Sequence, residues 1–324
     1  MTESRKGART RKGLIGGALL AAVSGIGLSV YSRRVARRAE ELVPAEGRFL
    51  DVAGARLHYI DVGASDAPTI VMVHGLAGQL RNFSYALVDR LKEDFRVIAV
   101  DRPGSGYSVA TGGGTPGVLV QGAIIADFIQ KLGLDRPLLV GHSLGGAIAL
   151  AVGLDHPERV RALALIAPLT QPQDTVPESF RGLARIPSGA RLAFAHILGT
   201  PLSRMTAEKT LKGVFAPEAV PEDFATRGGG ALSQRPIAIA AAAADLGAVN
   251  GDLTAMVARY ADIDRPVRIL FGRQDAILDP GLNGHRTAAV IADAKIDTIE
   301  GGHMIPITAP EACERFVRAA FAAG

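Results

Sequence analysis

The 324-residue chain has no tryptophan and a single cysteine, and only 5% of its residues are aromatic. One cysteine, Cys313, cannot form an intrachain disulfide, which excludes a small domain held together by disulfide bonds. The seven histidines show none of the spacings that bind metal ions, so we expect neither a metal nor another cofactor. Hydrophobic residues make up 48% of the chain, enough for a large buried core, and this excludes a disordered protein.

A basic surface on the folded body is also missing from the sequence, although the formal net charge is +4. Residues 1–40 hold nine basic and two acidic residues, a net charge of +7. The other 284 residues hold 27 basic and 30 acidic residues, a net charge of −3. We therefore expect no nucleic-acid partner. The glycine triplets at 112–114 and 228–230 follow no strand pattern and lack the Lys-Ser/Thr pair of a phosphate-binding loop.

Near the amino terminus, residues 13–32 form twenty consecutive positions without a charge. A helix of that length could cross a hydrocarbon layer of about 30 Å. We expect residues 1–43 to be a membrane-anchor segment and linker, with either orientation open because both flanks are basic. A cleaved export signal is the main alternative, and a soluble helix is the third. The basic residues that directly follow the uncharged run are Arg33, Arg34, Arg37 and Arg38.

From Gly47 onward, short runs rich in valine and isoleucine alternate with helical patterns, which indicates an α/β protein. The first two strands should form a hairpin about Ala53-Gly54, and the later ones, separated by helices, should be parallel. Strand patterns fall near 48–53, 56–62, 69–74, 96–101, 137–142, 162–167, 266–271 and 295–299. Helical patterns fall near 79–93, 117–132, 144–155, 281–292 and 308–322.

The alternation stops between Ala167 and Asp264, where eight prolines interrupt short helical pieces and no strand pattern occurs. Since the sheet pattern resumes at Pro266, we interpret this stretch as an inserted helical cap over the carboxyl edge of the sheet. The expected core is therefore residues 44–167 and 265–324, with the cap at 168–264.

The sharpest local pattern is Gly141-His-Ser143-Leu-Gly145, which lies between a strand pattern and a helix pattern. A tight turn there exposes a serine hydroxyl, and it requires glycine at 141 and 145 because side chains would collide with neighbouring backbone. Ser143 is therefore the candidate nucleophile. The backbone N–H groups of Leu76 and Leu144 are the candidate oxyanion donors.

Three histidines lie near these motifs, and we expect only one of them to act as a base. His74 should orient the loop that contains Leu76, and His142, on the opposite face of its strand from Ser143, should be structural. His303 follows the last strand pattern and opens the last helix, which places it at the same sheet edge as Ser143.

The acid that orients the imidazole of His303 is expected at the end of the preceding strand. Asp275 occupies that position in the sequence. Asp279, four residues on, is the first alternative, and Asp174, after the sixth strand, is the second.

The order Ser143, Asp275, His303, with an oxyanion loop upstream, resembles that of the α/β-hydrolase superfamily. The resemblance covers residues 47–322 and includes Asp101-Arg-Pro-Gly-Ser-Gly-Tyr-Ser108, similar to the superfamily's Asp-Arg-x-Gly-x-Gly-x-Ser turn, in which we expect Asp101 to brace the turn. The resemblance implies a mostly parallel, eight-stranded α/β-hydrolase sheet flanked by helices. The cap resembles the helical lids of lipases, esterases, dehalogenases and epoxide hydrolases.

Among these enzymes, dehalogenases and epoxide hydrolases use a carboxylate where this chain has Ser143, so the serine favours an acyl-enzyme. We expect cleavage of small carboxylic esters with apolar groups, since no basic cluster flanks the predicted pocket; Arg181, Arg185 and Arg191 are the nearest exceptions. Thioester cleavage, carbon–carbon bond hydrolysis and perhydrolysis use the same triad and stay open. A weakly catalytic ligand-binding receptor is the alternative from another class. Apolar cap residues that could line the pocket are Phe180, Leu183, Ile186, Leu192, Phe194, Ile197, Leu198, Met205, Phe215 and Phe224.

Overall fold

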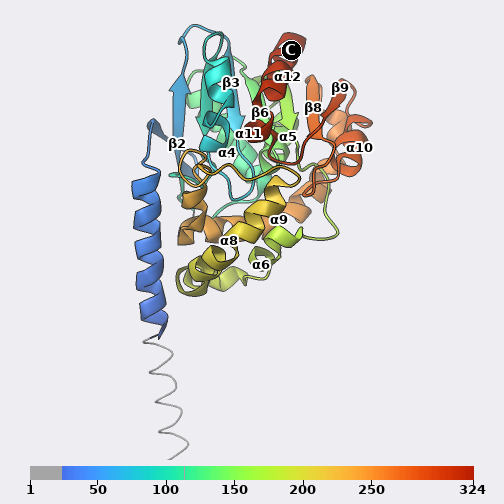
Figure 1. The fold of residues 1–324 in the computed structure, drawn as a ribbon. Helices are drawn as coiled ribbons and strands as arrows, with labels where there is room; N and C mark the ends of the chain where they lie inside the picture. The colour runs from blue at the N-terminus through green and yellow to red at the C-terminus, as the bar shows by residue number, and fades with distance from the viewer. Residues whose placement is uncertain (1–23, 113) are drawn as a thin grey trace, which may run out of the picture.

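The computed structural model describes residues 24–112 and 114–324. Within them, a nine-stranded sheet has the order β1-β2-β4-β3-β6-β7-β8-β9, with β5 paired to β2 (Figure 1). The strands from β4 to β9 along this order are parallel, whereas β2 is antiparallel to each of its neighbours β1, β4 and β5. The strands are β1 (Arg48–Val52), β2 (Ala55–Val62), β3 (Thr69–Val73), β4 (Arg96–Val100), β5 (Val109–Ala110), β6 (Leu138–His142), β7 (Ala162–Ile166), β8 (Val267–Gly272) and β9 (Ala294–Ile299).

The parallel strands are buried on both faces because helices cover each side of the sheet. In β3, Val71 and Val73 belong to the cluster that packs on α4 and α5, whereas Ile70 and Met72 belong to the cluster that includes α3 and α12. This alternation follows from the two-residue period of a strand. The helices outside the cap are α2 (Arg81–Ser84), α3 (Leu87–Leu91), α4 (Val118–Lys131), α5 (Leu144–Asp155), α10 (Arg286–Ala288), α11 (Ile305–Thr308) and α12 (Pro310–Ala323).

The hairpin about Ala53-Gly54 and the parallel strands are confirmed, and several boundaries are corrected. The sheet has nine strands rather than eight, because the two-residue β5 adds to β2. The helix expected at 79–93 is divided at Ala86, whose φ of −151° is not helical. The helix expected at 308–322 begins at Pro310, because a proline disfavours the helical conformation of the residue before it, here Ala309. In place of 281–292 the chain forms a short helical turn, Gly281–His285, and then α10.

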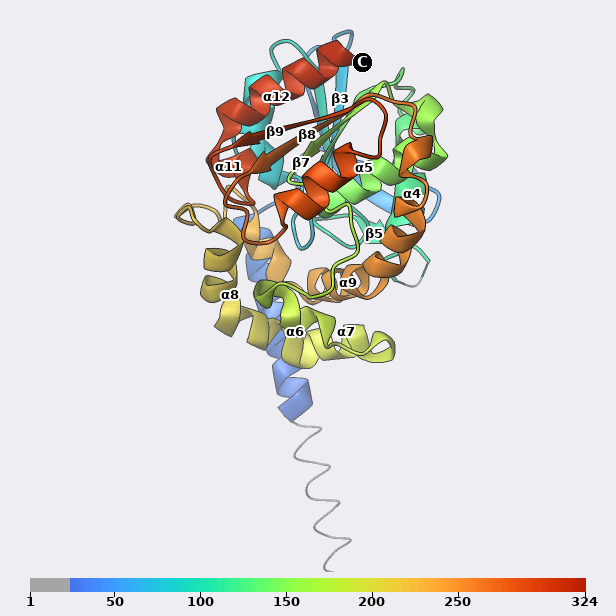
Figure 2. The same ribbon diagram turned by 90° about the vertical axis from the view of Figure 1, so that its right-hand side faces the viewer.

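Between β7 and β8, helices form a layer over the carboxyl edge of the parallel strands (Figures 1 and 2). Its longest helix is joined to the core, because Asp252 accepts a hydrogen bond from the N–H of Val118 at 2.6 Å and so caps α4. The helices of this layer are α6 (Arg181–Ala184), α7 (Arg191–Phe194), α8 (Thr200–Phe215) and α9 (Pro236–Val257).

Residues 24–42 are helical and form the N-terminal helix, which lies along the cap (Figure 2). Its buried Ala39 packs, together with Val43, against Leu232 of the cap, and Glu40 pairs with Arg235 at 3.0 Å. Of the expected anchor segment 1–43, residues 1–23 lie outside the described residues. Within the described residues, no helix has the length and apolar character needed to span a membrane.

Candidate active site

Ser143 lies on a sharp turn between β6 and α5. Its φ of +55° is in the left-handed region, which is a strained conformation for a residue other than glycine. A β-carbon at Gly145 would overlap the carbonyl oxygen of Val73, and one at Gly141 would overlap the carbonyl oxygen of Gly145. The turn therefore needs both glycines, for the steric reason expected from the sequence.

Asp275 and His303 lie at the ends of β8 and β9 and form a buried pair. The Nδ1–H of His303 donates to Oδ2 of Asp275 at 2.7 Å, and the two side chains are 4% and 0% exposed. The other carboxylate oxygen accepts the backbone N–H groups of Ile277 and Leu278 at 2.8 and 2.9 Å. Because the carboxylate holds Nδ1–H, Nε2 is the basic nitrogen of the imidazole.

The two alternative acids lie elsewhere. Asp279 is exposed, and its Oδ1 accepts the N–H of Leu282 at 2.6 Å at the start of the next helical turn. Asp174 is exposed in the segment after β7. The structure thus places Asp275, and neither alternative, against the imidazole of His303.

The loop that carries His303 is held from two sides. His142, which precedes Ser143, donates from Nε2 to the carbonyl oxygen of His303 at 3.0 Å, with the two rings 5.0 Å apart. From the cap, the carboxylate of Glu218 accepts the N–H of Gly302 at 3.0 and 3.2 Å. The pKa of His142 is lowered to about 3, first by burial and then by His303, so it is a neutral hydrogen-bond donor.

Leu76 and Leu144 line a small cavity of about 70 Å³ together with Ser143. The loop before Leu76 packs directly on the serine, since a β-carbon at Gly75 would lie 2.9 Å from Cβ of Ser143. Leu144 is the first residue of α5, so its N–H has no acceptor within the helix. An oxyanion formed in this cavity would have both N–H groups as candidate donors.

Arg102 is a residue of the site that the sequence analysis missed. Its side chain is fully buried and donates to the carbonyl oxygens of His74 and Gly75 at 3.1 and 3.0 Å. Its backbone N–H donates to Nε2 of His74 at 3.0 Å, and Nδ1–H of His74 donates to Gly75 at 2.8 Å. Burial, with Arg102 beside it, holds the pKa of His74 well below its usual value, so His74 is neutral and orients the loop.

Asp245, on α9 of the cap, completes the site around Arg102. Its carboxylate pairs with Nη1 of Arg102 at 3.0 Å and accepts from Gln121 at 2.8 Å. Burial raises the pKa of Asp245, while Arg102 and Gln121 act in the opposite direction. Asp245 also lines the small cavity beside Ser143. The sequence held one indication of this role, because Asp245 is the first charged residue after the uncharged run 236–244.

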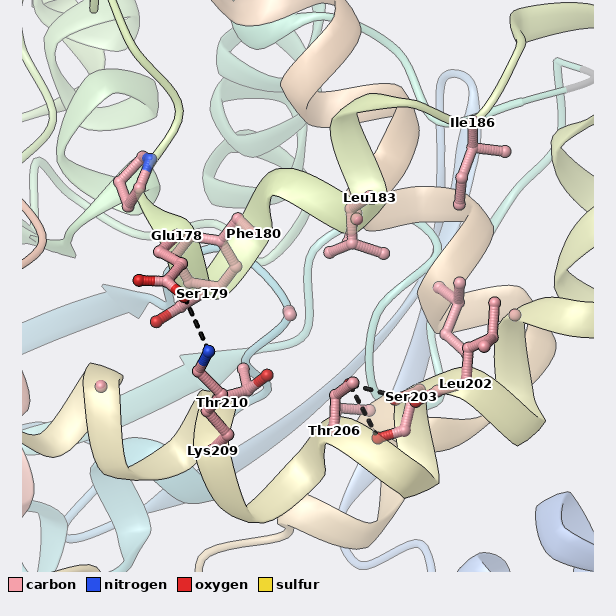
Figure 3. A pocket seen from close by; sticks show the side chains of 18 of the residues that line it. Glu178, Ser179, Phe180, Leu183, Ile186, Leu202, Ser203, Thr206, Lys209 and Thr210 are labelled. Carbon is pink, nitrogen blue, oxygen red and sulfur yellow. Dashed lines mark hydrogen bonds and ion pairs between the residues drawn. The ribbon is translucent and has the colours of Figure 1, made fainter.

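A larger cavity of about 650 Å³ opens within the cap next to the small one, and the two share Pro177, Phe180 and Ile277 (Figure 3). Four of the ten predicted residues line it: Phe180, Leu183, Ile186 and Phe194. The other six lie elsewhere, because Leu192, Leu198 and Met205 are exposed, Phe215 and Phe224 pack on Met304, and Ile197 lines a separate groove.

One basic residue lines the larger cavity, so it is not flanked by a basic cluster. Lys209 is exposed at its edge and pairs with Glu178 at 2.7 Å (Figure 3). Arg181 and Arg185 are exposed and do not line the cavity.

The described residues contain no group of three histidine, cysteine, aspartate or glutamate side chains that could hold a metal ion.

Acid should destabilise the folded chain because His74 and His142 are buried and neutral. The unfolded chain binds protons on both histidines below about pH 6.5, while the folded chain does not, so stability is present above that pH and is lost as the pH falls. We expect each histidine to cost about 1.4 kcal/mol per pH unit in this range. Urea unfolding at several pH values measures how the free energy of unfolding changes with pH. His142→Gln should make this dependence less steep. An equally steep dependence in that variant would show that His142 does not contribute to it.

A family model described as the alpha/beta hydrolase fold matches residues 68–310. Haloalkane dehalogenase 2 of Mycobacterium tuberculosis is 26% identical over 279 residues, covering 84% of this chain and 93% of the dehalogenase. The dihydrolipoyllysine-residue acetyltransferase component of the acetoin cleaving system of Cupriavidus necator is 36% identical over 130 residues. That match covers 40% of this chain and only 34% of the relative.

The fold is also similar to the crystal structure of a membrane phospholipase A described as a bacterial virulence factor. The TM-score is 0.64 at 22% identity, and the match covers 96% of this chain and 99% of the phospholipase. At this identity the similarity concerns the fold.

Proposed function

The chain belongs to the α/β-hydrolase fold family, and we propose that it is a serine hydrolase that cleaves carboxylic esters through an acyl-enzyme on Ser143. The proposal rests on one arrangement. A serine on a strained turn lines a small cavity together with Leu76 and Leu144, at the sheet edge where a buried Asp275–His303 pair leaves Nε2 basic.

In the proposed reaction, Oγ of Ser143 attacks the ester carbonyl carbon while Nε2 of His303 takes its proton. The N–H groups of Leu76 and Leu144 stabilise the resulting oxyanion. The imidazolium then gives its proton to the departing alkoxide, which leaves as the alcohol, and water releases the acyl group by the same steps. Asp275 holds the imidazole in orientation through its hydrogen bond to Nδ1–H.

The identity of the nucleophile distinguishes the proposed ester hydrolysis from the dehalogenation that the relative's name describes. Displacement of a halide at an alkyl carbon by this fold requires a carboxylate nucleophile, and this chain has Ser143 in that place. Hydrolysis of an acyl group through a serine ester is the chemistry that the residue supports.

The cap cavity favours neutral, apolar acyl groups. On a series of p-nitrophenyl esters we expect kcat/KM to rise by up to about fourfold for each methylene that the cavity accepts. Gly182 lines the cavity, and a β-carbon there would have open space, so Gly182→Leu should lower kcat/KM for long but not short esters. Gly189, also open but away from the cavity, offers the matched control Gly189→Leu.

Three results would contradict this substrate class. Charged esters hydrolysed faster than neutral ones of equal size would show that the cavity recognises charge. Faster turnover of the matching thioesters would reassign the reaction. Binding of esters without hydrolysis would favour the receptor alternative.

We also propose that the N-terminal segment, residues 1–43, tethers the enzyme to a membrane. The support is the length of the uncharged run and the arginines that follow it, of which Arg33, Arg34, Arg37 and Arg38 are exposed.

A further inference from the structure

Exposed apolar side chains are concentrated at one end of the molecule. Of the thirteen large hydrophobic residues that are exposed among the described residues, six belong to residues 24–30 of the N-terminal helix or to residues 192–205 of the cap. Met205, at 81%, is the most exposed of all. We define the cap-end surface by Ile26, Val30, Leu192, Leu198, Leu202 and Met205.

These residues lie on adjoining elements. Leu198, Leu202 and Met205 have the spacing of one helix face, and the turn Ala195–Gly199 leads directly into α8. Ile26 lines a shallow groove together with His196 and Ile197, so the N-terminal helix adjoins this face. Figure 2 shows α6, α7, α8 and the first turns of that helix at the same end of the molecule.

The same end is basic, although the folded body as a whole is not. Residues 178–212 hold six basic and two acidic residues, a net charge of +4, whereas the rest of residues 41–324 holds 21 basic and 28 acidic residues, a net charge of −7. Arg181, Arg185 and Arg204 are exposed. The average over the sequence hid this local excess of basic residues in the cap. Exposed apolar side chains in a segment with an excess of exposed basic ones fit an interface with anionic lipid.

We propose that the cap-end surface rests on a bilayer with anionic headgroups, inserting Leu198, Leu202 and Met205 between the headgroups. The N-terminal helix agrees, because its first described residues lie at this end and residues 13–23 of the uncharged run precede them in the sequence. Leu202, Ser203 and Thr206 of α8 line the cap cavity (Figure 3), so its opening lies beside the proposed interface. Given the proposed ester hydrolysis, an apolar ester could enter from the membrane without crossing water.

The absence of tryptophan allows a direct test on the full chain. In the Met205→Trp variant, we expect the tryptophan fluorescence to shift to the blue on phosphatidylglycerol vesicles and to be quenched by brominated acyl chains. Both effects should be much smaller on phosphatidylcholine vesicles. Val290→Trp is the matched control, because Val290 is 45% exposed and precedes β9 at the opposite edge of the sheet. Its emission should not change.

The contribution of the exposed arginines of the cap to membrane contact can be tested separately. Arg185→Gln with Arg204→Gln should lower the rate on an ester carried in anionic vesicles by about tenfold or more and leave the rate on a soluble short ester unchanged. Lys295→Gln, near the amino-terminal end of β9, should change neither rate.

The outcomes separate the cap surface from the tether and from the enzyme activity. If the chain floats with vesicles while the emission of the Met205→Trp variant stays unchanged, the proposed membrane contact of the cap-end surface is wrong and the proposed N-terminal tether is supported. A chain that neither floats nor shifts would overturn both. Loss of soluble ester hydrolysis concerns the active site and leaves the emission result valid.

Discussion

Replacing Ser143 with alanine is expected to reduce kcat for ester hydrolysis by on the order of 10³-fold or more and to abolish covalent labelling by a fluorophosphonate. The reason is that this hydroxyl is the proposed nucleophile, so both the acyl-enzyme and the inhibitor adduct form on its oxygen. Steady-state kinetics on a p-nitrophenyl ester and mass spectrometry of the labelled chain measure the two effects. Labelling that survives in the alanine variant would refute the assignment.

The other members of the proposed triad should show losses of similar order. Asp275→Asn removes the carboxylate that accepts Nδ1–H of His303, and His303→Ala removes the base. Asp279→Asn is the matched control, since Asp279 only accepts the N–H of Leu282 on the surface and should lose little activity. A larger loss at Asp279 than at Asp275 would transfer the acid role.

Replacing Asp245 with alanine is expected to destabilise the folded chain by about 3–5 kcal/mol. The substitution leaves the guanidinium of Arg102 fully buried without its carboxylate, although Gln121 and two backbone carbonyls still accept from it. Urea unfolding of the parent and variant chains measures the difference. A variant as stable as the parent would show that the pair contributes little to folding.

A double variant separates stability from catalysis. Arg102→Met combined with Asp245→Leu removes both charges together, so much of the stability should return. Activity should stay low, because the carbonyls of His74 and Gly75 lose the donors that hold the oxyanion loop. Full activity in the double variant would show that the loop keeps its position without Arg102.

These contacts show how the cap takes part in the site. Asp245 of α9 reaches the oxyanion loop through Arg102, and Glu218 binds the backbone beside His303. The cap therefore contacts the loops that carry the candidate oxyanion donor Leu76 and the candidate base His303. It does more than cover the cavity.

Local pattern was enough to predict the strands and the turn at Ser143. The parallel strands are continuous apolar runs because both faces are buried, and the turn needs glycine at 141 and 145 because backbone lies where side chains would be. The position of Asp275 also followed from the sequence, since the ends of parallel strands share one edge of the sheet. By contrast, β5 is too short to give a pattern.

The sequence by itself thus determined the α/β sheet, the strained turn and the order of the candidate triad, all of which depend on residues close together in the chain or on strand order. Tertiary structure alone decided what surrounds them. Arg102 and Asp245 are 143 residues apart and meet only because α9 crosses the sheet edge. Likewise, Phe194 lines the cavity while Leu192 is exposed, because in short helices a residue's burial depends on which neighbour the helix meets in the fold.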